Sequence, residues 1–121
     1  MTEHAFVVGA DGAVLHHHAP PARTAVSLPD SRDLWSVLWS HRANLAGVAH
    51  THPGGGRPAP SREDVTTFAA VEAGLGRRLV WWIANADGVA AFGWAGPERF
   101  DYTEFPPGPT PWLSALQATL R

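Results

Sequence analysis

Two histidines and an aspartate are spaced in this chain as ligands of a metal ion would be. His50 and His52 stand two positions apart, and because side chains alternate along an extended segment, both imidazoles are expected on one face. Pro53 disfavours helical backbone angles at His52, which supports the extended geometry. Asp64 follows beyond a loop. Two imidazoles and one carboxylate leave one tetrahedral position open on zinc, the feature that separates catalytic from structural zinc sites.

The segment between the histidines and Asp64 predicts how the third ligand reaches the other two. Residues 53–60 are rich in proline and glycine and form a loop, because such a run fits neither a helix nor a central strand. Ser61 is predicted to cap a helix N-terminus, with Asp64 at the third position of the first turn. The loop can then bring Asp64 over the two imidazoles. A His-x-His pair alone would also fit a strand with one exposed and one partly buried histidine.

The whole string from Ala49 to Asp64 resembles the signature of the JAMM (JAB/MPN) metalloproteases, in which His-x-His-Pro is followed by a short loop and Ser-x-x-Asp. Residues 60–64 also resemble the RadC-type branch of prokaryotic members. The loop between His52 and Ser61 is one residue longer than is usual in the family. Because insertions in loops rich in glycine and proline cost little, this difference concerns the path of the loop more than the ligands.

The resemblance implies an α/β (α+β) fold with a mixed β-sheet flanked by helices, the JAB/MPN-like (cytidine-deaminase-like) architecture. It also implies one Zn²⁺ per chain, held by His50, His52 and Asp64. In JAMM enzymes a glutamate upstream of the His-x-His takes a proton from the attacking water and later gives it to the leaving amine. Glu3 is the only glutamate before His50, so it is the candidate base. The alternative for Glu3 is a solvated residue near the chain terminus.

Ser61 could have a structural role or a catalytic role. As a helix cap its hydroxyl would contribute on the order of 1 kcal/mol to stability. The resemblance implies a second role, a hydrogen bond donated to the oxyanion of the tetrahedral intermediate, a contribution of about 2.7–4 kcal/mol in the transition state. The two roles compete for one hydroxyl group, and the catalytic one is the prediction here.

Composition and charge are those of an ordinary globular domain. The chain has 121 residues, which suits a single JAB/MPN-like domain over residues 1–121. Its formal net charge of −2 argues against a general nucleic-acid surface. It contains no cysteine, which excludes disulfides and thiolate-ligated zinc. We see neither a signal peptide nor an apolar run of membrane-spanning length, and we therefore expect a cytoplasmic protein with no membrane partner.

Apolar periodicity and turn residues predict one unit of strands and helices without repeats. Two hairpins are expected, each around an Asp-Gly pair. The last helix is expected to begin with Thr110 as its N-cap and Pro111 in its first position. The predicted helices cover residues 30–45, 61–75 and 110–120. The predicted strands cover residues 5–8, 13–16, 47–50, 79–83 and 89–94, with an edge strand within 98–105.

Three further groups of residues invite a functional interpretation. The run His16-His17-His18 could bind a metal, but an exposed strand end is the preferred interpretation, with alternate side chains on opposite faces. The pair Trp81-Trp82 is expected to place one indole in the core and the other at the surface. Arg57 and Arg62 flank the candidate site, where they could meet a substrate carboxylate or simply be solvated.

The predicted function is that of a zinc-dependent metallopeptidase or isopeptidase. The resemblance implies that it cleaves after the C-terminal tail of a ubiquitin-like protein, in deconjugation or in precursor processing. Such a tail can lie beside a sheet edge by β-augmentation. The alternatives are a non-catalytic MPN-like scaffold and a RadC-like protein of undefined activity. The ubiquitin-like protein, or its conjugates, is the expected partner.

Overall fold

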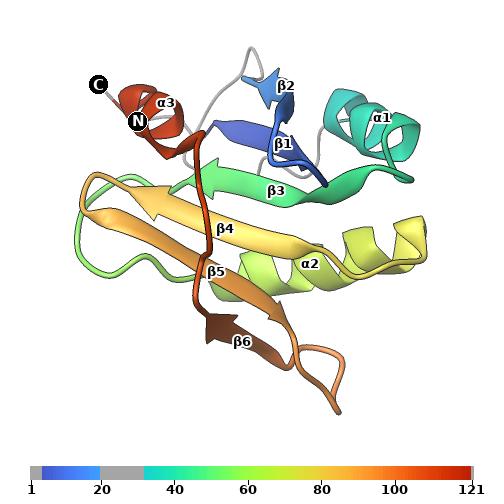
Figure 1. The fold of residues 1–121 in the computed structure, drawn as a ribbon. Coiled ribbons are helices and arrows are strands. Elements are labelled where there is room, and N and C mark those ends of the chain that lie inside the picture. Colours follow the sequence, from blue (N-terminus) through green and yellow to red (C-terminus); the bar gives the residue numbers. More distant parts are fainter. Residues whose placement is uncertain (1–3, 20–31, 121) are drawn as a thin grey trace.

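The computed structural model describes residues 4–19 and 32–120, which contain six strands and three helices. Six strands form one sheet in the order β2-β1-β3-β4-β5-β6 (Figure 1). The strands are β1 (Ala5–Gly9), β2 (Val14–His18), β3 (Leu45–Thr51), β4 (Val80–Asn85), β5 (Gly88–Trp94) and β6 (Tyr102–Phe105). The helices are α1 (Arg32–Ser40), α2 (Arg62–Leu75) and α3 (Leu113–Ala118).

The pairing of the strands makes the sheet mixed. Strands β3 and β4 are parallel, whereas the other neighbours in the described sheet are antiparallel. Parallel neighbours need a crossover connection, which α2 supplies together with the loop before it. The crossover starts at the carboxyl end of β3, and the start of α2 lies near this end of the strand. The predicted class, a mixed sheet flanked by helices, is confirmed.

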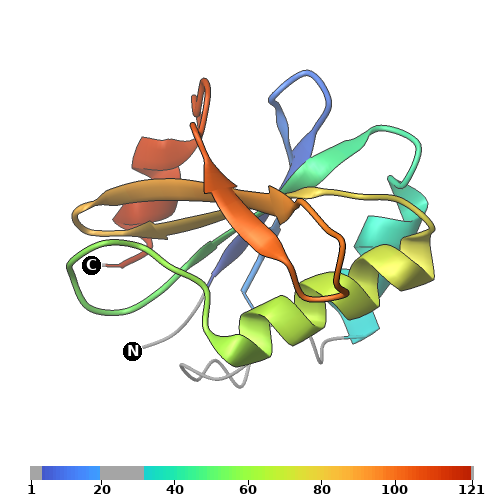
Figure 2. The same ribbon diagram turned by 90° about the horizontal axis from the view of Figure 1, so that it is seen from below.

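Helices cover both faces of the sheet. Helices α1 and α2 lie on one face and α3 lies on the other (Figures 1 and 2). Each face therefore has its own apolar core, one packed under α1 and α2 and the other packed under α3. No helix in the described part of the chain is both long enough and apolar enough to span a bilayer.

The two cores explain why the prediction for Trp81 and Trp82 was wrong. Both indoles are buried, because alternation along β4 sends them to opposite faces and both faces are covered. Trp81 stacks on Phe68 of α2 with ring centroids 4.2 Å apart. Trp82 meets Trp112, next to α3, edge to face at 5.2 Å. Neither indole is left at the surface.

The end of α1 also differs from the prediction. The helix was expected to reach Leu45, but it ends at Ser40, and Leu45 begins β3 and is 1% exposed. A turn separates the two elements, in which the N–H of Asn44 donates to the carbonyl of His41 at 2.8 Å. The carbonyl of Asn44 then accepts from the N–H of Ala10, beside β1. Leu45 fits a helical period and a buried strand equally well, so tertiary pairing decided its place.

The C-terminal segment and the histidine run bring two more corrections. The last helix was predicted to begin with Thr110 as its N-cap and Pro111 in its first position, but α3 begins at Leu113 with Trp112 at the N-cap position. The backbone carbonyl of Thr110 accepts a hydrogen bond from the N–H of Leu113. In β2 the side chains alternate as expected, since the rings of His16 and His18 face each other with centroids 6.1 Å apart. His18 is buried, however, so the run is not simply an exposed strand end.

Candidate metal centre

The three predicted ligands come together at the carboxyl end of β3. The Nε2 atoms of His50 and His52 are 3.2 Å apart. Oδ2 of Asp64 lies 2.9 Å from Nε2 of His52, and Oδ1 lies 3.7 Å from Nε2 of His50. Ligand bonds of about 2.0–2.1 Å in a tetrahedral zinc site would separate neighbouring ligand atoms by about 3.3–3.4 Å. The three side chains therefore have the chemistry and the spacing of a metal site, and among the described residues they form such a cluster.

Backbone hydrogen bonds on both sides hold the histidine segment straight. The N–H of Thr51 donates to the carbonyl of His4, and Oγ1 of Thr51 accepts from the N–H of His4 at 2.9 Å. On the other side the N–H of His52 donates to the carbonyl of Ala84, just past the last β3–β4 pair. Because both neighbouring strands fix this end of β3, the two imidazoles project from an extended backbone onto the same side.

Asp64 is oriented by the helix it stands on. Ser61 caps α2 as predicted: Oγ of Ser61 accepts from the N–H of Asp64 at 3.0 Å. In return, Oδ2 of Asp64 accepts from the N–H of Ser61 at 2.9 Å, which completes a capping box. The same carboxylate thus caps the helix and faces the histidines. Its side chain is 16% exposed, against 8% for His50 and 22% for His52, so the cluster is partly open to solvent.

The capping box changes the prediction for Ser61. The hydroxyl was expected to serve either as a cap or as an oxyanion donor, with the two roles in competition. As a cap, Oγ accepts a hydrogen bond, which uses an oxygen lone pair. The O–H proton is still able to donate elsewhere, so the two roles are compatible.

The charge of Asp64 suits a metal ligand. Burial alone would favour the neutral acid, but hydrogen bonds with His50 and His52 and from the backbone of Ser61 outweigh it. Together they hold the pKa of the Asp64 carboxyl well below its usual range. The carboxylate is therefore ionised at neutral pH, as coordination requires.

Comparison with known families agrees with this geometry. A family model described as prokaryotic homologs of the JAB domain matches residues 5–96, which include Ser61 and all three candidate ligands. The chain is a prokaryotic JAB-domain protein. This confirms the family predicted from the signature. A search of curated proteins finds none that matches the chain.

In this JAB domain the loop before α2 is tied to the hairpin between β4 and β5. The N–H of Gly56 donates to Oδ2 of Asp87 at 2.6 Å, and Nδ2 of Asn85 donates to the carbonyl of Gly56 at 3.0 Å. Oδ1 of Asn85 also accepts from the N–H groups of Asp87 and Gly88, so one buried side chain joins loop and turn. Sequence reasoning took Asp87-Gly88 only for a hairpin turn. A carboxylate beside a glycine-rich loop became a clue only once the fold placed the two together.

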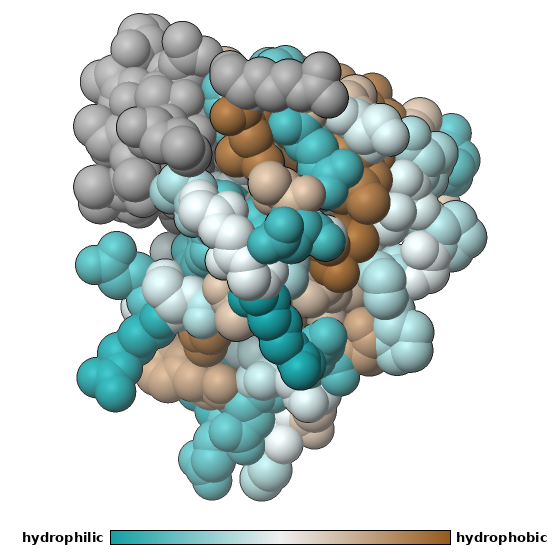
Figure 3. Space-filling view, turned by 90° about the vertical axis from the view of Figure 1, so that its left-hand side faces the viewer, coloured by the Kyte–Doolittle hydropathy of each residue, from teal (hydrophilic) through white to brown (hydrophobic). Residues whose placement is uncertain are grey.

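The two arginines near the JAB site have different surroundings. Arg57 forms an ion pair with Glu104 of β6, so it links the loop to the edge strand. Its side chain is 77% exposed, which makes the pair a weak contribution to stability. Arg62 is exposed at the start of α2. Figure 3 shows this end of the molecule, where hydrophilic side chains cover much of the described surface beside an apolar band.

Glu3, the candidate base, lies outside the described residues. The residue bonded to it, His4, is buried and hydrogen-bonded through its backbone to Thr51, between the two histidine ligands. Nδ1 of His4 also lies 2.8 Å from Nε2 of His17 in β2. His4, the residue that follows Glu3, therefore pairs with the strand segment that carries the metal ligands.

Proposed function

We propose that this protein is a zinc-dependent hydrolase of peptide or isopeptide bonds. The observation that carries the proposal is the convergence of His50, His52 and Asp64, partly open to solvent, on a JAB domain. Three protein ligands leave a coordination position for water or substrate, as catalytic zinc sites require. When bound, zinc would polarise the scissile carbonyl and activate water at neutral pH.

Two side chains would carry the remaining steps. The carboxylate of Glu3 takes a proton from the attacking water and delivers it to the nitrogen of the leaving amine. The backbone hydrogen bond from His4 to Thr51, between the two histidine ligands, supports the choice of Glu3, the residue before His4, as the base. The hydroxyl of Ser61 donates to the oxygen that gains negative charge as the carbonyl becomes tetrahedral. The cap hydrogen bond, in which the oxygen of this hydroxyl lies 3.0 Å from the backbone nitrogen of Asp64, supports this role.

The proposed substrate is the C-terminal tail of a ubiquitin-like protein, joined either to a target or to a precursor extension. A flexible glycine-rich tail can lie extended along a sheet edge, where backbone groups provide most of the affinity. Strands β2 and β6 are the edges of the described sheet. We propose that the reaction takes place in the cytoplasm.

The test combines metal analysis with a cleavage assay. The purified protein is analysed for zinc by mass spectrometry and is then mixed with a linear fusion in which an extension follows the glycine-rich tail of a ubiquitin-like protein. About one zinc per chain and release of the fused extension are expected. A protein that holds zinc but cleaves no such fusion would contradict the proposed substrate, and a protein that holds no metal would contradict the hydrolase itself.

A further inference from the structure

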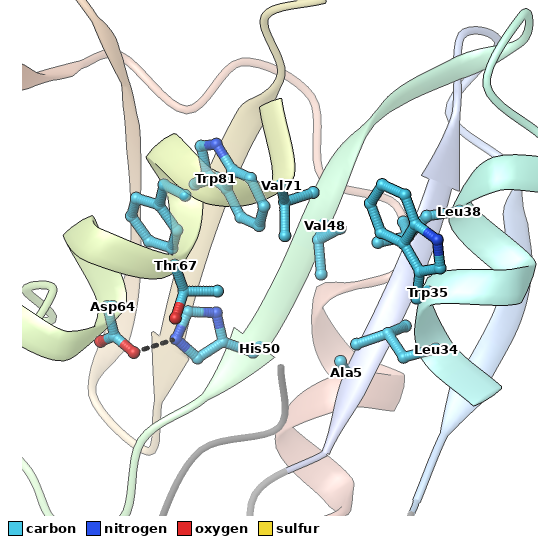
Figure 4. A pocket seen from close by; sticks show the side chains of 11 residues that line it. Ala5, Leu34, Trp35, Leu38, Val48, His50, Asp64, Thr67, Val71 and Trp81 are labelled. Atoms are coloured by element: carbon cyan, nitrogen blue, oxygen red, sulfur yellow. Dashed lines mark ion pairs between the residues drawn. The ribbon is translucent and has the colours of Figure 1, made fainter. Parts of the chain in front are cut away.

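An apolar cleft leads away from the metal cluster between α1 and α2. His50 and Asp64 form one end of it, and the sheet forms its floor (Figure 4). In Figure 4, Thr67 lies close to this end, whereas Trp35 and Leu38 of α1 close the opposite side. The apolar walls include Leu34, Trp35, Val48, Phe68, Val71 and Trp81. A group that fills the cleft must therefore lie directly beside the candidate metal ligands.

The size and lining of the cleft restrict what can fill it. Its volume is about 40 Å³, while one water needs roughly 10–15 Å³ by the same measure. The cleft thus has space for roughly three to four groups the size of a methyl or methylene. Apart from His50, Asp64 and Thr67, the described lining residues are apolar, and an anionic group here would lose its hydration without gaining a cationic partner among them.

Trp35 sets the outer limit of the cleft. Its indole is 36% exposed and lies over Gly74 of α2, where an added Cβ would come within 2.7 Å of the ring. The absence of a side chain at Gly74 therefore allows the indole to close against α2. Removing this indole should enlarge the cleft with little effect on the core, because the ring is at the surface.

We propose that this cleft is a specificity pocket for a short aliphatic side chain of the released segment, next to the scissile bond, because the glycine-rich tail on the other side of that bond carries no side chain to fill it. The proposal rests on the hydrolase function, since the ligands at the end of the cleft place its occupant beside the reacting carbonyl. A branched side chain of valine, leucine or isoleucine size fits the space. An aromatic ring is too large for it, and an anionic side chain is disfavoured by the apolar walls and by Asp64.

Small hydroxamates test this without a known substrate, because each carries the same metal-binding group. The zinc-loaded protein is titrated by calorimetry with acetohydroxamic acid, 4-methylpentanohydroxamic acid, 3-phenylpropanohydroxamic acid and succinic acid monohydroxamate. The branched aliphatic compound should bind at least about tenfold more tightly than acetohydroxamic acid, since hydrophobic pockets discriminate by roughly that factor per added methylene. The phenyl and carboxylate compounds should gain little or nothing.

Two tryptophan variants show whether the cleft itself makes the choice. Trp35→Ala should reverse the preference, so that the phenyl compound binds more tightly than the branched aliphatic one. Trp39→Ala is the matched control: Trp39 stands one turn further along α1, is 44% exposed, and does not line the cleft. It should keep the wild-type order. If Trp35→Ala fails to fold, Val71→Leu, which fills the cleft, should weaken the branched compound and leave acetohydroxamic acid unchanged.

The outcomes separate this proposal from the function on which it rests. If all four compounds bind equally well, the specificity pocket is wrong while the metal site stands. If the same order persists in Trp35→Ala, the cleft is not the source of the selectivity and the proposal is again wrong. A protein that retains no zinc and binds none of the compounds would overturn both the hydrolase function and the pocket.

Discussion

Helix α2 carries Asp64 in its first turn and Glu72 in its last, and these two carboxylates have opposite surroundings. Asp64 faces the Nε2 atoms of His50 and His52, which can bind a metal, and it is partly exposed. Glu72 has a side chain that is 2% exposed and accepts from groups that can only donate: the N–H of Leu79, the indole N–H of Trp81 and the guanidinium of Arg78. The hydroxyl of Tyr102 completes this second set.

The comparison shows how the same chemical group becomes structural at one end of a helix and reactive at the other. Donors surround Glu72, so its charge is satisfied within the fold and it joins α2 to β4 and β6. Burial and the hydrogen bond to the Glu72 carboxylate raise the pKa of Tyr102 above its usual value, which keeps that hydroxyl a donor. Asp64 instead lies beside the imidazole nitrogens of His50 and His52, which can bind a metal ion together with it. Substitutions at the two ends of α2 should therefore have opposite effects on metal binding and on stability.

Removing the charge of Asp64 should abolish metal binding and leave the fold intact. Asp64→Asn keeps an oxygen to accept from the N–H of Ser61 but removes the anionic ligand, so zinc content and hydrolysis should fall to background. His52→Ala should do the same. Zinc is measured by mass spectrometry and folding by circular dichroism. Glu63→Gln, an exposed neighbour in the same turn, is the control and should retain zinc. Full zinc occupancy in a His50→Ala and His52→Ala double variant would contradict the ligand assignment.

Glu3→Gln should separate binding from chemistry. The amide cannot take a proton from water, so hydrolysis should fall by about 10²–10⁴-fold while zinc content and stability stay the same. Single-turnover rates on the proposed fusion substrate give the measurement. Near-normal turnover, or full activity after deletion of the first residues, would mean that another carboxylate is the base.

Ser61→Ala tests whether the cap also donates a hydrogen bond. Turnover should fall by about 10²–10³-fold, as expected for one oxyanion donor, and stability should fall by about 1 kcal/mol. Ser61→Asp keeps a capping oxygen but has no proton to donate when ionised, so stability should recover while turnover stays low. Zinc content is measured in both variants, since the new carboxylate stands near the metal cluster. An active Ser61→Ala enzyme would limit Ser61 to its structural role.

Glu72→Ala should give the reverse phenotype of Asp64→Asn. Loss of the carboxylate leaves buried donors without an acceptor, which should cost about 2–3 kcal/mol of unfolding free energy. Zinc content at temperatures where the variant is folded should be unchanged. Chemical denaturation gives the stability, and Glu98→Ala, at an exposed position, is the control. Loss of zinc without loss of stability would show that the two carboxylates are not independent.

Tyr102→Phe should have the smallest effect. The phenylalanine keeps the ring against Phe68, whose centroid lies 5.5 Å away, and removes only one of the donors to Glu72. The unfolding free energy should fall by about 1 kcal/mol, the usual net contribution of one hydrogen bond. Zinc content and turnover should not change. A variant as unstable as Glu72→Ala would mean that this one hydrogen bond maintains the whole cluster.

The metal cluster could be predicted from the sequence because the relations that build it are local. Strand alternation relates His50 to His52, and the first turn of a helix relates Ser61 to Asp64. Only the closing of the loop between them is a tertiary event. The N-cap predicted at Ser61 is present, and the Asp64 side chain completes a capping box that was not predicted. The role of Glu3 remains a prediction, since it lies outside the described residues.

The features that the sequence did not predict depend on contacts between residues far apart in the chain. The burial of Trp82 depends on Trp112 beside α3, and the start of β3 at Leu45 depends on pairing with β1. The link from Asp87 to Gly56, and the donors around Glu72, likewise come from distant segments. Local spacing determines which side chains a turn of helix or strand presents. Whether those side chains are then buried depends on how helices pack on the two faces of the sheet, and no local pattern contains that information.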